Sequence, residues 1–216
     1  RHPALMQSRA QSLLLLHGVV VIFGFTGILG KLISIEAEPL VFWRVTLGGA
    51  TTALFLWMAK RWQAWTWRGV AEAALVGWVV AAHWVTFFAS IKTSSVGLAL
   101  TMLATAPLFV GSIEPLVFGR RIALRELAVA AMVFLGIALV FDAEQDQWTG
   151  MMLGLVSALL AAVFSTVNGV LVRRHDPINL SAVELLSASV GMVLWLVLRG
   201  QWGPGVWTMS TADWVW

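Results

Sequence analysis

The chain has 216 residues, of which 59% are hydrophobic and 12% are charged, and its formal net charge is +3. So little polar surface cannot cover a globule of this length, which excludes a soluble α/β domain and favours a chain solvated by the lipid bilayer. No cysteine is present, so disulfides, thiolate metal sites and a cysteine nucleophile are excluded, and the positive charges form short clusters at helix ends that act as topology anchors, so that no nucleic-acid partner is expected.

Seven apolar segments follow one another along the chain, and each has about the 17 to 25 residues that a helix needs to cross a bilayer. They are Leu13 to Leu32, Pro39 to Ala59, Val70 to Ile91, Ser94 to Phe118, Ile122 to Phe141, Gly150 to Val172 and Leu180 to Leu198. Lipid leaves the backbone to satisfy its own hydrogen bonds, and the segments are too uniformly apolar for barrel strands. The sequence therefore predicts an all-α fold, a polytopic transmembrane helix bundle.

Basic residues alternate between the two sides of these segments. Those on one side are Arg1, Arg9, Lys60, Arg61, Arg68, Arg120, Arg121, Arg125, Arg173 and Arg174. Those on the other side are Lys31, Lys92 and Arg199, and the longest connection there carries Asp142, Glu144 and Asp146. The positive-inside rule then predicts a cytoplasmic amino terminus. We expect an integral, multi-pass protein of the plasma membrane, or inner membrane in a bacterium.

The two parts of the chain match weakly at a shift of about 140 residues, as in a transporter built from repeats. In both parts an apolar helix leads to a short polar loop with a proline and then to an apolar helix carrying one ionisable group. At this shift Arg44, Gly48 and Thr51 correspond to Glu184, Ala188 and Gly191.

The first unit has an odd number of helices, so its copy must enter the membrane from the opposite side, which makes an inverted-topology repeat. We expect a first five-helix repeat over residues 10–142 and the start of a second over residues 149–216, with two helices and the beginning of a third. The chain starts at Arg1 and ends at Trp216 as a new apolar run begins, so we expect a fragment of a longer protein.

Three stretches resemble the EamA-like transporters of the drug/metabolite transporter superfamily. They are His83-Trp84-Val85-Thr86-Phe87-Phe88-Ala89-Ser90-Ile91-Lys92-Thr93-Ser94-Ser95, Ala106-Pro107-Leu108-Phe109 and Gly119-Arg120-Arg121. The family often has Gly-Glu where Gly119-Arg120 stands. The resemblance implies a carrier with two five-helix repeats that moves small organic solutes, often as an exporter.

Two ionisable residues inside apolar segments are candidates for the solute pathway. Arg44 lies about five residues into the second segment, where it either snorkels to the surface or faces the interior to meet an anionic solute group or a carboxylate. Glu184 lies at the mirrored depth, where it either pairs with Arg173 or Arg174 or acts as a gate or proton-binding carboxylate.

Other polar residues within the segments leave similar alternatives. Glu114 lies close to Arg120 and Arg121, which favours an ion pair, with a role in coupling as the alternative. His83 shares a helix face with Thr86 and Ser90, which favours a hydrogen bond within the core over a solute or proton contact.

The fourth and sixth segments each carry a seam of small and polar residues. These seams are Ser94, Gly97, Thr101, Thr105 and Ser112 in the fourth, and Gly150, Gly154, Ser157, Ser165 and Asn168 in the sixth. Close helix packing is one interpretation, and a solute pathway that includes Thr101, Thr105 and Asn168 is the other. Pro107 lies on a different face and is expected to loosen the backbone after Leu103.

These observations predict a secondary transporter of small metabolites or drug-like solutes that works by alternating access, with protons as a candidate coupling ion and a cavity between the third, fourth and sixth segments. No enzyme signature, metal site or cofactor site is recognised. A seven-helix sensor is one alternative, although Leu180 to Leu198 lacks the lysine of a retinal protein. An intramembrane transferase is the other, and it would cluster histidine and acidic residues near one surface.

Overall fold

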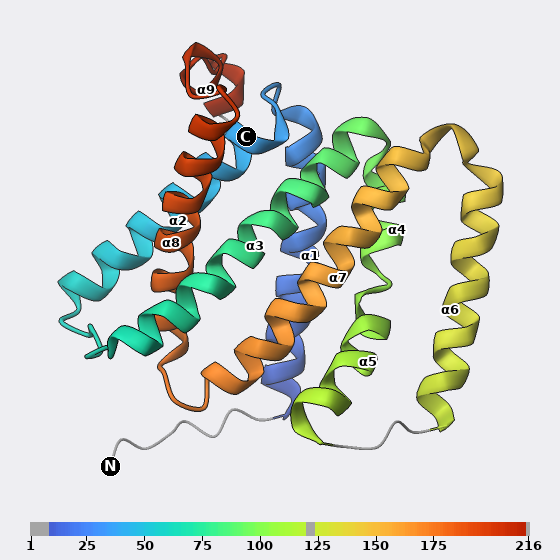
Figure 1. Cartoon of the computed structure of the whole chain (residues 1–216), viewed down its shortest axis with the longest axis horizontal. Helices are drawn as coiled ribbons and strands as arrows, with labels where there is room; N and C mark the ends of the chain where they lie inside the picture. Colours follow the sequence, from blue (N-terminus) through green and yellow to red (C-terminus); the bar gives the residue numbers. More distant parts are fainter. Residues whose placement is uncertain (1–8, 120–123, 215–216) are drawn as a thin grey trace.

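Helices account for every regular element in residues 9–119 and 124–214, the parts of the chain that this computed structural model describes (Figure 1). They are α1 Arg9–Leu32, α2 Ala37–Met58, α3 Trp67–Thr93, α4 Val96–Leu103, α5 Ala106–Phe118, α6 Leu124–Ala143, η1 Gln145–Gln147, α7 Trp148–Leu171, α8 Pro177–Leu198, α9 Pro204–Trp207 and η2 Ala212–Trp214. Seven stretches are long and apolar enough to cross a membrane, with α4 and α5 together forming one of them. The predicted polytopic helix bundle is confirmed.

The fourth predicted segment is one span in length but two helices in structure. α4 stops at Leu103, and α5 begins at Ala106 with a proline in its first turn. Pro107 has no N–H to give to the carbonyl of Leu103, and its ring crowds that carbonyl, so the helix cannot continue unbroken. At the break the Thr105 hydroxyl donates to the carbonyl of Met102 at 2.6 Å. The expected loosening before Pro107 is therefore confirmed as a complete break.

The connections between the helices lie at the two ends of the bundle. Residues 59–66 and 172–176 lie at one end, together with the start of α1, and we call this the basic end (Figure 1). Residues 33–36, 94–95, 144–147 and 199–203 lie at the opposite end, which we call the far end. α1 and α7 run in opposite directions between these ends, and so do α2 and α8.

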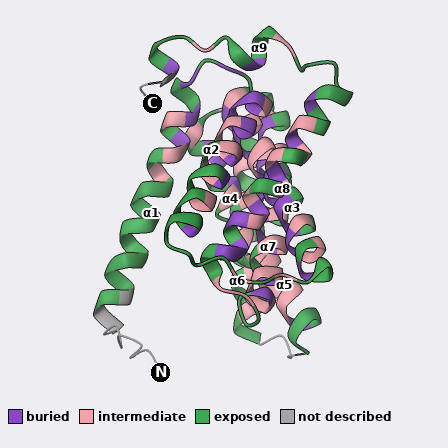
Figure 2. Ribbon diagram, turned by 90° about the vertical axis from the view of Figure 1, so that its left-hand side faces the viewer, coloured by how far each residue is buried: buried purple, intermediate pink, exposed green. Residues whose placement is uncertain are grey.

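The core of the bundle lies along α3. This helix packs against α7 and α8, and α2 packs along α8. A Cβ atom at Gly77 would overlap the backbone carbonyl of Glu184, so α3 approaches the α8 backbone directly. By contrast α1 and α6 show mostly exposed apolar side chains, and the exposed length of α1 is plain in Figure 2. Such faces suit contact with lipid or with further helices.

Two lysines at the far end each bond to the carboxyl end of the helix that carries the other lysine. Lys31, in the last turn of α1, donates to the carbonyls of Ile91 and Ser94 at the end of α3, at 2.8 and 3.2 Å. Lys92, in the last turn of α3, donates to the carbonyl of Ile33 just after α1, at 2.9 Å. Helix carboxyl ends carry unpaired carbonyls and partial negative charge, which cations stabilise. These lysines therefore stabilise local structure at an end that has few other basic residues.

Candidate functional site

Arg44 lies in α2 and faces α3 with its side chain half-buried. Its guanidinium carbon is 5.2 Å from the ring centre of Trp84 and 5.2 Å from that of Phe88. The Nε atom is buried and has no hydrogen-bond partner among the described residues, and no salt bridge to Arg44 occurs among them. The cation is thus held by two aromatic faces, an arrangement worth about 0.5 to 2 kcal/mol at each face. Whether Arg44 snorkels to the membrane surface or meets a solute stays a prediction.

Glu184 lies in α8 and is 6% exposed. One carboxylate oxygen accepts a hydrogen bond from the side-chain amide of Asn168 in α7 at 3.3 Å, and the other is buried without a partner. The expected pairing with Arg173 or Arg174 is wrong. Arg174 instead meets Glu72 at 3.7 Å, and Arg173 lies 5.3 Å from the ring centre of Phe118.

Arg44 and Glu184 do not meet, because they lie on opposite sides of the point where α2 and α8 cross. At the crossing, a Cβ atom on Gly49 would lie 3.1 Å from the backbone nitrogen of Leu186. The hydroxyls of Thr46 and Ser189 are 2.6 Å apart across the same contact. Arg44 lies on the far-end side of this crossing, and Glu184 lies on its basic-end side.

His83 is a buried contact between α3 and α7. Its Nδ1 atom is 2.9 Å from the carbonyl oxygen and 2.9 Å from the hydroxyl of Ser157. The ring also packs 5.4 Å from that of Phe164. These contacts use one ring nitrogen for helix packing, which agrees with the interpretation of His83 as a hydrogen-bonded core residue. Its role toward a solute or a proton stays a prediction.

The small-residue seam of α7 serves close packing over its first half. A Cβ atom at Gly154 would lie 2.6 Å from that of Met102, and the Ser90 hydroxyl donates to the carbonyl of Gly150 at 2.7 Å. In the fourth segment, Thr101 is exposed and bonds back to the carbonyl of Gly97, whereas Thr105 is buried at the break. The described contacts do not join Thr101, Thr105 and Asn168 into one site.

Glu114 lines a cavity of about 660 Å³ between α5 and α6, together with Arg125 and Glu126. Glu114 does interact with another residue. Its expected partners, Arg120 and Arg121, lie outside the described residues.

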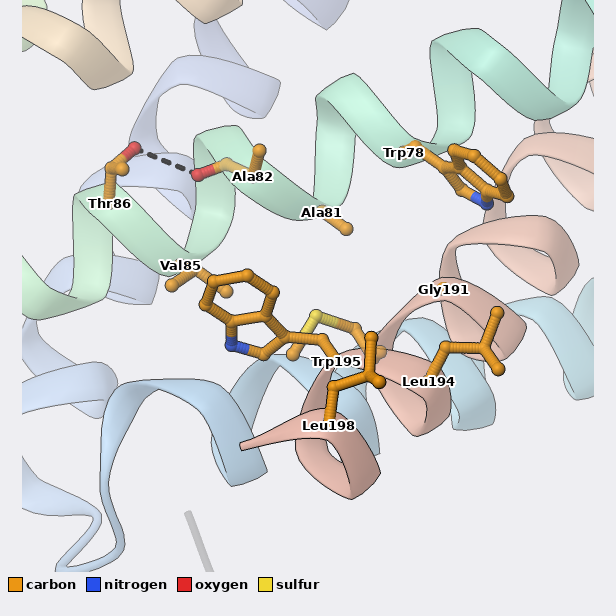
Figure 3. A pocket seen from close by; sticks show the side chains of 10 residues that line it. Trp78, Ala81, Ala82, Val85, Thr86, Gly191, Leu194, Trp195 and Leu198 are labelled. Atoms are coloured by element: carbon orange, nitrogen blue, oxygen red, sulfur yellow. Dashed lines mark hydrogen bonds between the residues drawn. The ribbon is translucent and has the colours of Figure 1, made fainter. Parts of the chain in front are cut away.

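Two further cavities flank α3. A cavity of about 440 Å³ between α3, α5 and α7 lies among valine and phenylalanine side chains, with Glu72 and Arg174 at its rim. It involves the third, fourth and sixth predicted segments, but none of the predicted pathway residues lines it. A groove of about 420 Å³ between α3 and α8 is walled by Trp78 and Trp195, as Figure 3 shows. This groove was not predicted from the sequence, because Trp78 and Trp195 lie within apolar segments far apart along the chain and come together only where α3 packs against α8.

The EamA-like transporter family matches residues 11–142. An uncharacterized transporter of Bacillus subtilis (strain 168), YxxF, is 24% identical over 181 residues, which cover 81% of this chain and 58% of that protein. An uncharacterized transporter of Archaeoglobus fulgidus is 22% identical over 125 residues, which cover 58% of this chain and 46% of that protein.

A solved crystal structure of a protein with 17% sequence identity has a TM-score of 0.58 and is matched over 92% of this chain and 72% of its own. This likeness concerns the fold alone. The chain spans about half the length of the curated relatives that it matches.

Proposed function

The chain belongs to the EamA-like transporter family, and from that membership and the geometry of its spans we propose that it carries small metabolites or drug-like solutes by alternating access. Both curated relatives bear the name of transporter, which supports this proposal. We further propose export as the direction, the plasma or bacterial inner membrane as the location, and the basic end as the cytoplasmic one. Excess basic charge at that end supports this orientation.

One observation carries the proposal: two ionisable side chains lie inside membrane-spanning helices without a charged partner among the described residues. Arg44 is held by aromatic rings, and Glu184 has a buried carboxylate oxygen that no donor reaches. Ionisable groups at such depth are costly, and in membrane proteins they mark solute or ion pathways more often than structural contacts. The cost is reduced when a solute or a proton supplies the missing partner.

The two groups suit different ligands. Arg44 suits an anionic group of the solute, because its guanidinium is held in place and its Nε atom is free to donate. Glu184 suits a proton or a cationic group, with Asn168 orienting the carboxylate through its amide. For His83 and Thr105 the contacts support a packing role instead, and Thr101 would reach a solute only from the exposed side of α4.

We also propose that residues 10–142 form a first five-helix repeat and that residues 149–216 begin an inverted second one. The ends of α2 and α8 support this, since both helices have 22 residues. After α2, the N–H of Lys60 donates to Trp57 and that of Arg61 to Leu56; after α8, the N–H of Gly200 donates to Val197 and that of Gln201 to Leu196. Lys60 and Gly200 both have left-handed backbone, with φ of 51° and 66°.

The proposal is tested by counterflow with the full-length protein in proteoliposomes, against a panel of amino acids, nucleosides and cationic drugs. Exchange of at least one solute is expected, and no exchange of any of them would refute the carrier. Glu184→Gln and Arg44→Gln should each reduce exchange at least ten-fold. The matched controls are Glu72→Gln and Arg68→Gln, which change the same charges near the basic end of α3, away from Arg44 and Glu184. Equal loss in the controls would refute the assigned roles.

A further inference from the structure

Residues 199–214 bind the far ends of α1 and α2 through one carboxylate. Asp213 accepts hydrogen bonds from the backbone N–H of Ser34 at 2.7 Å, from the Ser34 hydroxyl at 2.8 Å, and from the N–H and hydroxyl of Ser210 at 2.9 and 2.7 Å. These donors, the N–H of Ser34 foremost, hold the pKa of the Asp213 carboxyl well below its usual range. The indole N–H of Trp43 adds a bond to the carbonyl of Val206 at 2.8 Å. We call this set the far-end latch.

An aromatic cluster packs under the far-end latch. Phe42 and Trp43 of α2 meet Trp202 and Trp207, and the ring centres in contact are 5.2 to 6.1 Å apart in edge-to-face geometry. Each such pair contributes about 0.5 to 1.5 kcal/mol beyond its area burial. The latch is thus a packed contact around the Asp213 carboxylate, which also attracts the Lys92 ammonium electrostatically.

A second polar contact joins the same two parts of the chain at the basic end. The side-chain oxygen of Asn179 accepts from the N–H of Gln63 at 2.9 Å, and its amide donates to the carbonyl of Arg61 at 3.0 Å. The N–H of Asp176 donates to the side chain of Gln63 at 3.0 Å. Asn179 is 2% exposed, so these bonds are shielded from water. We call this set the basic-end latch.

The two latches occupy corresponding places in the proposed repeat. The connection before α2 ends at Glu36, and the connection before α8 ends at Asp176. The first takes part in the far-end latch and the second in the basic-end latch, so these two connections correspond. Residues 59–66 after α2 correspond in the same way to the residues directly after α8. Each latch therefore joins one part of the first repeat to one part of the second.

The crossing of α2 and α8 lies between the latches. The small residues Gly48, Gly49 and Ala188 bring the two backbones together there. The crossing lies about 15 Å along α2 from either end of that helix, at 1.5 Å per residue. A rotation of one half against the other about this point would open one end and compress the other.

We propose that the two latches are alternating gates of the carrier: the far-end latch must break to open the far end, the basic-end latch must break to open the basic end, and the state with both formed is the occluded one. This inference rests on the proposed function and assigns Asp213 and Asn179 as positioning residues of the transport cycle. Neither residue needs to touch the solute.

The experiment measures opening directly in the full-length protein. Single reporters, the half-buried Val193→Cys on the far-end side of the crossing and Thr52→Cys on its basic-end side, are labelled with a membrane-impermeant maleimide in intact cells and in inside-out vesicles. Asp213→Asn should raise labelling of the Val193→Cys reporter about ten-fold and lower that of the Thr52→Cys reporter, because the amide cannot replace the charge-assisted hydrogen bonds of the carboxylate. Asn179→Ala should do the reverse.

Matched controls break polar contacts within the first half only. Lys31→Gln removes a contact at the far end, and Thr66→Ala removes the cap of α3 at the basic end. Both should leave the labelling ratio unchanged. Ser34→Ala provides a milder second variant of the far-end latch and should shift the ratio in the same direction as Asp213→Asn.

The pattern must be reciprocal, whichever end faces the cytoplasm. If both latch variants raise labelling of both reporters, they merely loosen the fold, and the alternating gates are refuted; unchanged labelling also refutes them. Counterflow by the unmodified protein is scored separately. Absent exchange with reciprocal labelling refutes the carrier alone, and exchange without a labelling shift refutes the latches alone.

Discussion

Replacing Gly77 with alanine should destabilise the bundle more than any other glycine-to-alanine change in α3. The new Cβ atom would overlap the carbonyl oxygen of Glu184 and the hydroxyl oxygen of Ser187, and it would lie 2.8 Å from the carbonyl carbon of Glu184. The hydroxyl can rotate away, but the backbone of α8 cannot, so the two helices must separate. Overpacking of a rigid contact costs about 3 kcal/mol, at the upper part of the usual range.

For a chain of this length, a loss of about 3 kcal/mol lowers the melting temperature by roughly 6 to 12 °C. The assay is thermal unfolding in detergent, followed by the loss of the monodisperse peak in size-exclusion chromatography. Gly24→Ala in α1 is the matched control, because nothing lies within 4 Å of its Cβ position. That change should be neutral or stabilising by up to about 1 kcal/mol, from helix propensity. If Gly77→Ala and Gly24→Ala have the same melting temperature, the direct contact between α3 and α8 is refuted.

Three further changes test other contacts. His83→Leu removes the imidazole contact to the carbonyl and hydroxyl of Ser157, while the hydroxyl keeps its bond to the backbone carbonyl of residue 83, so the melting temperature should fall by the equivalent of about 1 kcal/mol; an unchanged melt would contradict the α3 to α7 contact. Thr105→Val should lower stability by about 1 kcal/mol through the bond to Met102, and a larger loss in Thr101→Val would reverse the assignment of the buried hydroxyl. The side-chain amide and then the N–H of Asn179 lower the pKa of Asp176, so its contribution as cap of α8 is present above its ordinary pKa and is lost as pH falls through the lowered value. Melts of Asp176→Asn and of the unmodified protein should therefore converge on acidification, and divergence would contradict the cap.

The spans followed from hydropathy because lipid removes the alternatives: an apolar stretch of this length has only one way to satisfy its backbone. The break at Thr105 was partly foreseen, since the effect of Pro107 on Leu103 is local. Helix partners were harder to predict. Gly77 looks in the sequence like any glycine within an apolar run, and its contact with Glu184 depends on how α3 and α8 come together in space.

The predicted site residues likewise divide into those with a local signal in the sequence and those whose contacts depend on the fold. Arg44 and Glu184 stand out because any ionisable group in such a span needs a partner, but only the fold reveals which partners are absent. The aromatic partners of Arg44 lie about 40 residues along the chain, on another helix. Asp213 and Asn179 were not predicted, because they lie outside the apolar segments, where polar residues ordinarily meet water, and here they bond to connections far away in sequence.

A carrier built from two inverted copies of one unit would open either end at the same cost in free energy if the copies were identical. The gradients of solute and coupling ion set the net direction of transport, but residues that differ between the copies set which end is more often open. Arg44 and Glu184 are such a pair: at corresponding positions of α2 and α8 the charge changes sign, and the crossing separates the cation from the carboxylate. A solute with an anionic group would gain its partner on the far-end side, and a proton or cationic group on the basic-end side. The two latches also differ, since the Asp213 carboxylate accepts the hydrogen bonds of the first, whereas the second combines the Asn179 amide with the ion pair of Arg61 and Asp176 at 3.7 Å. If the proposed function holds, we expect the bias between opening inward and opening outward to lie in these four side chains rather than in the backbone that the two repeats share.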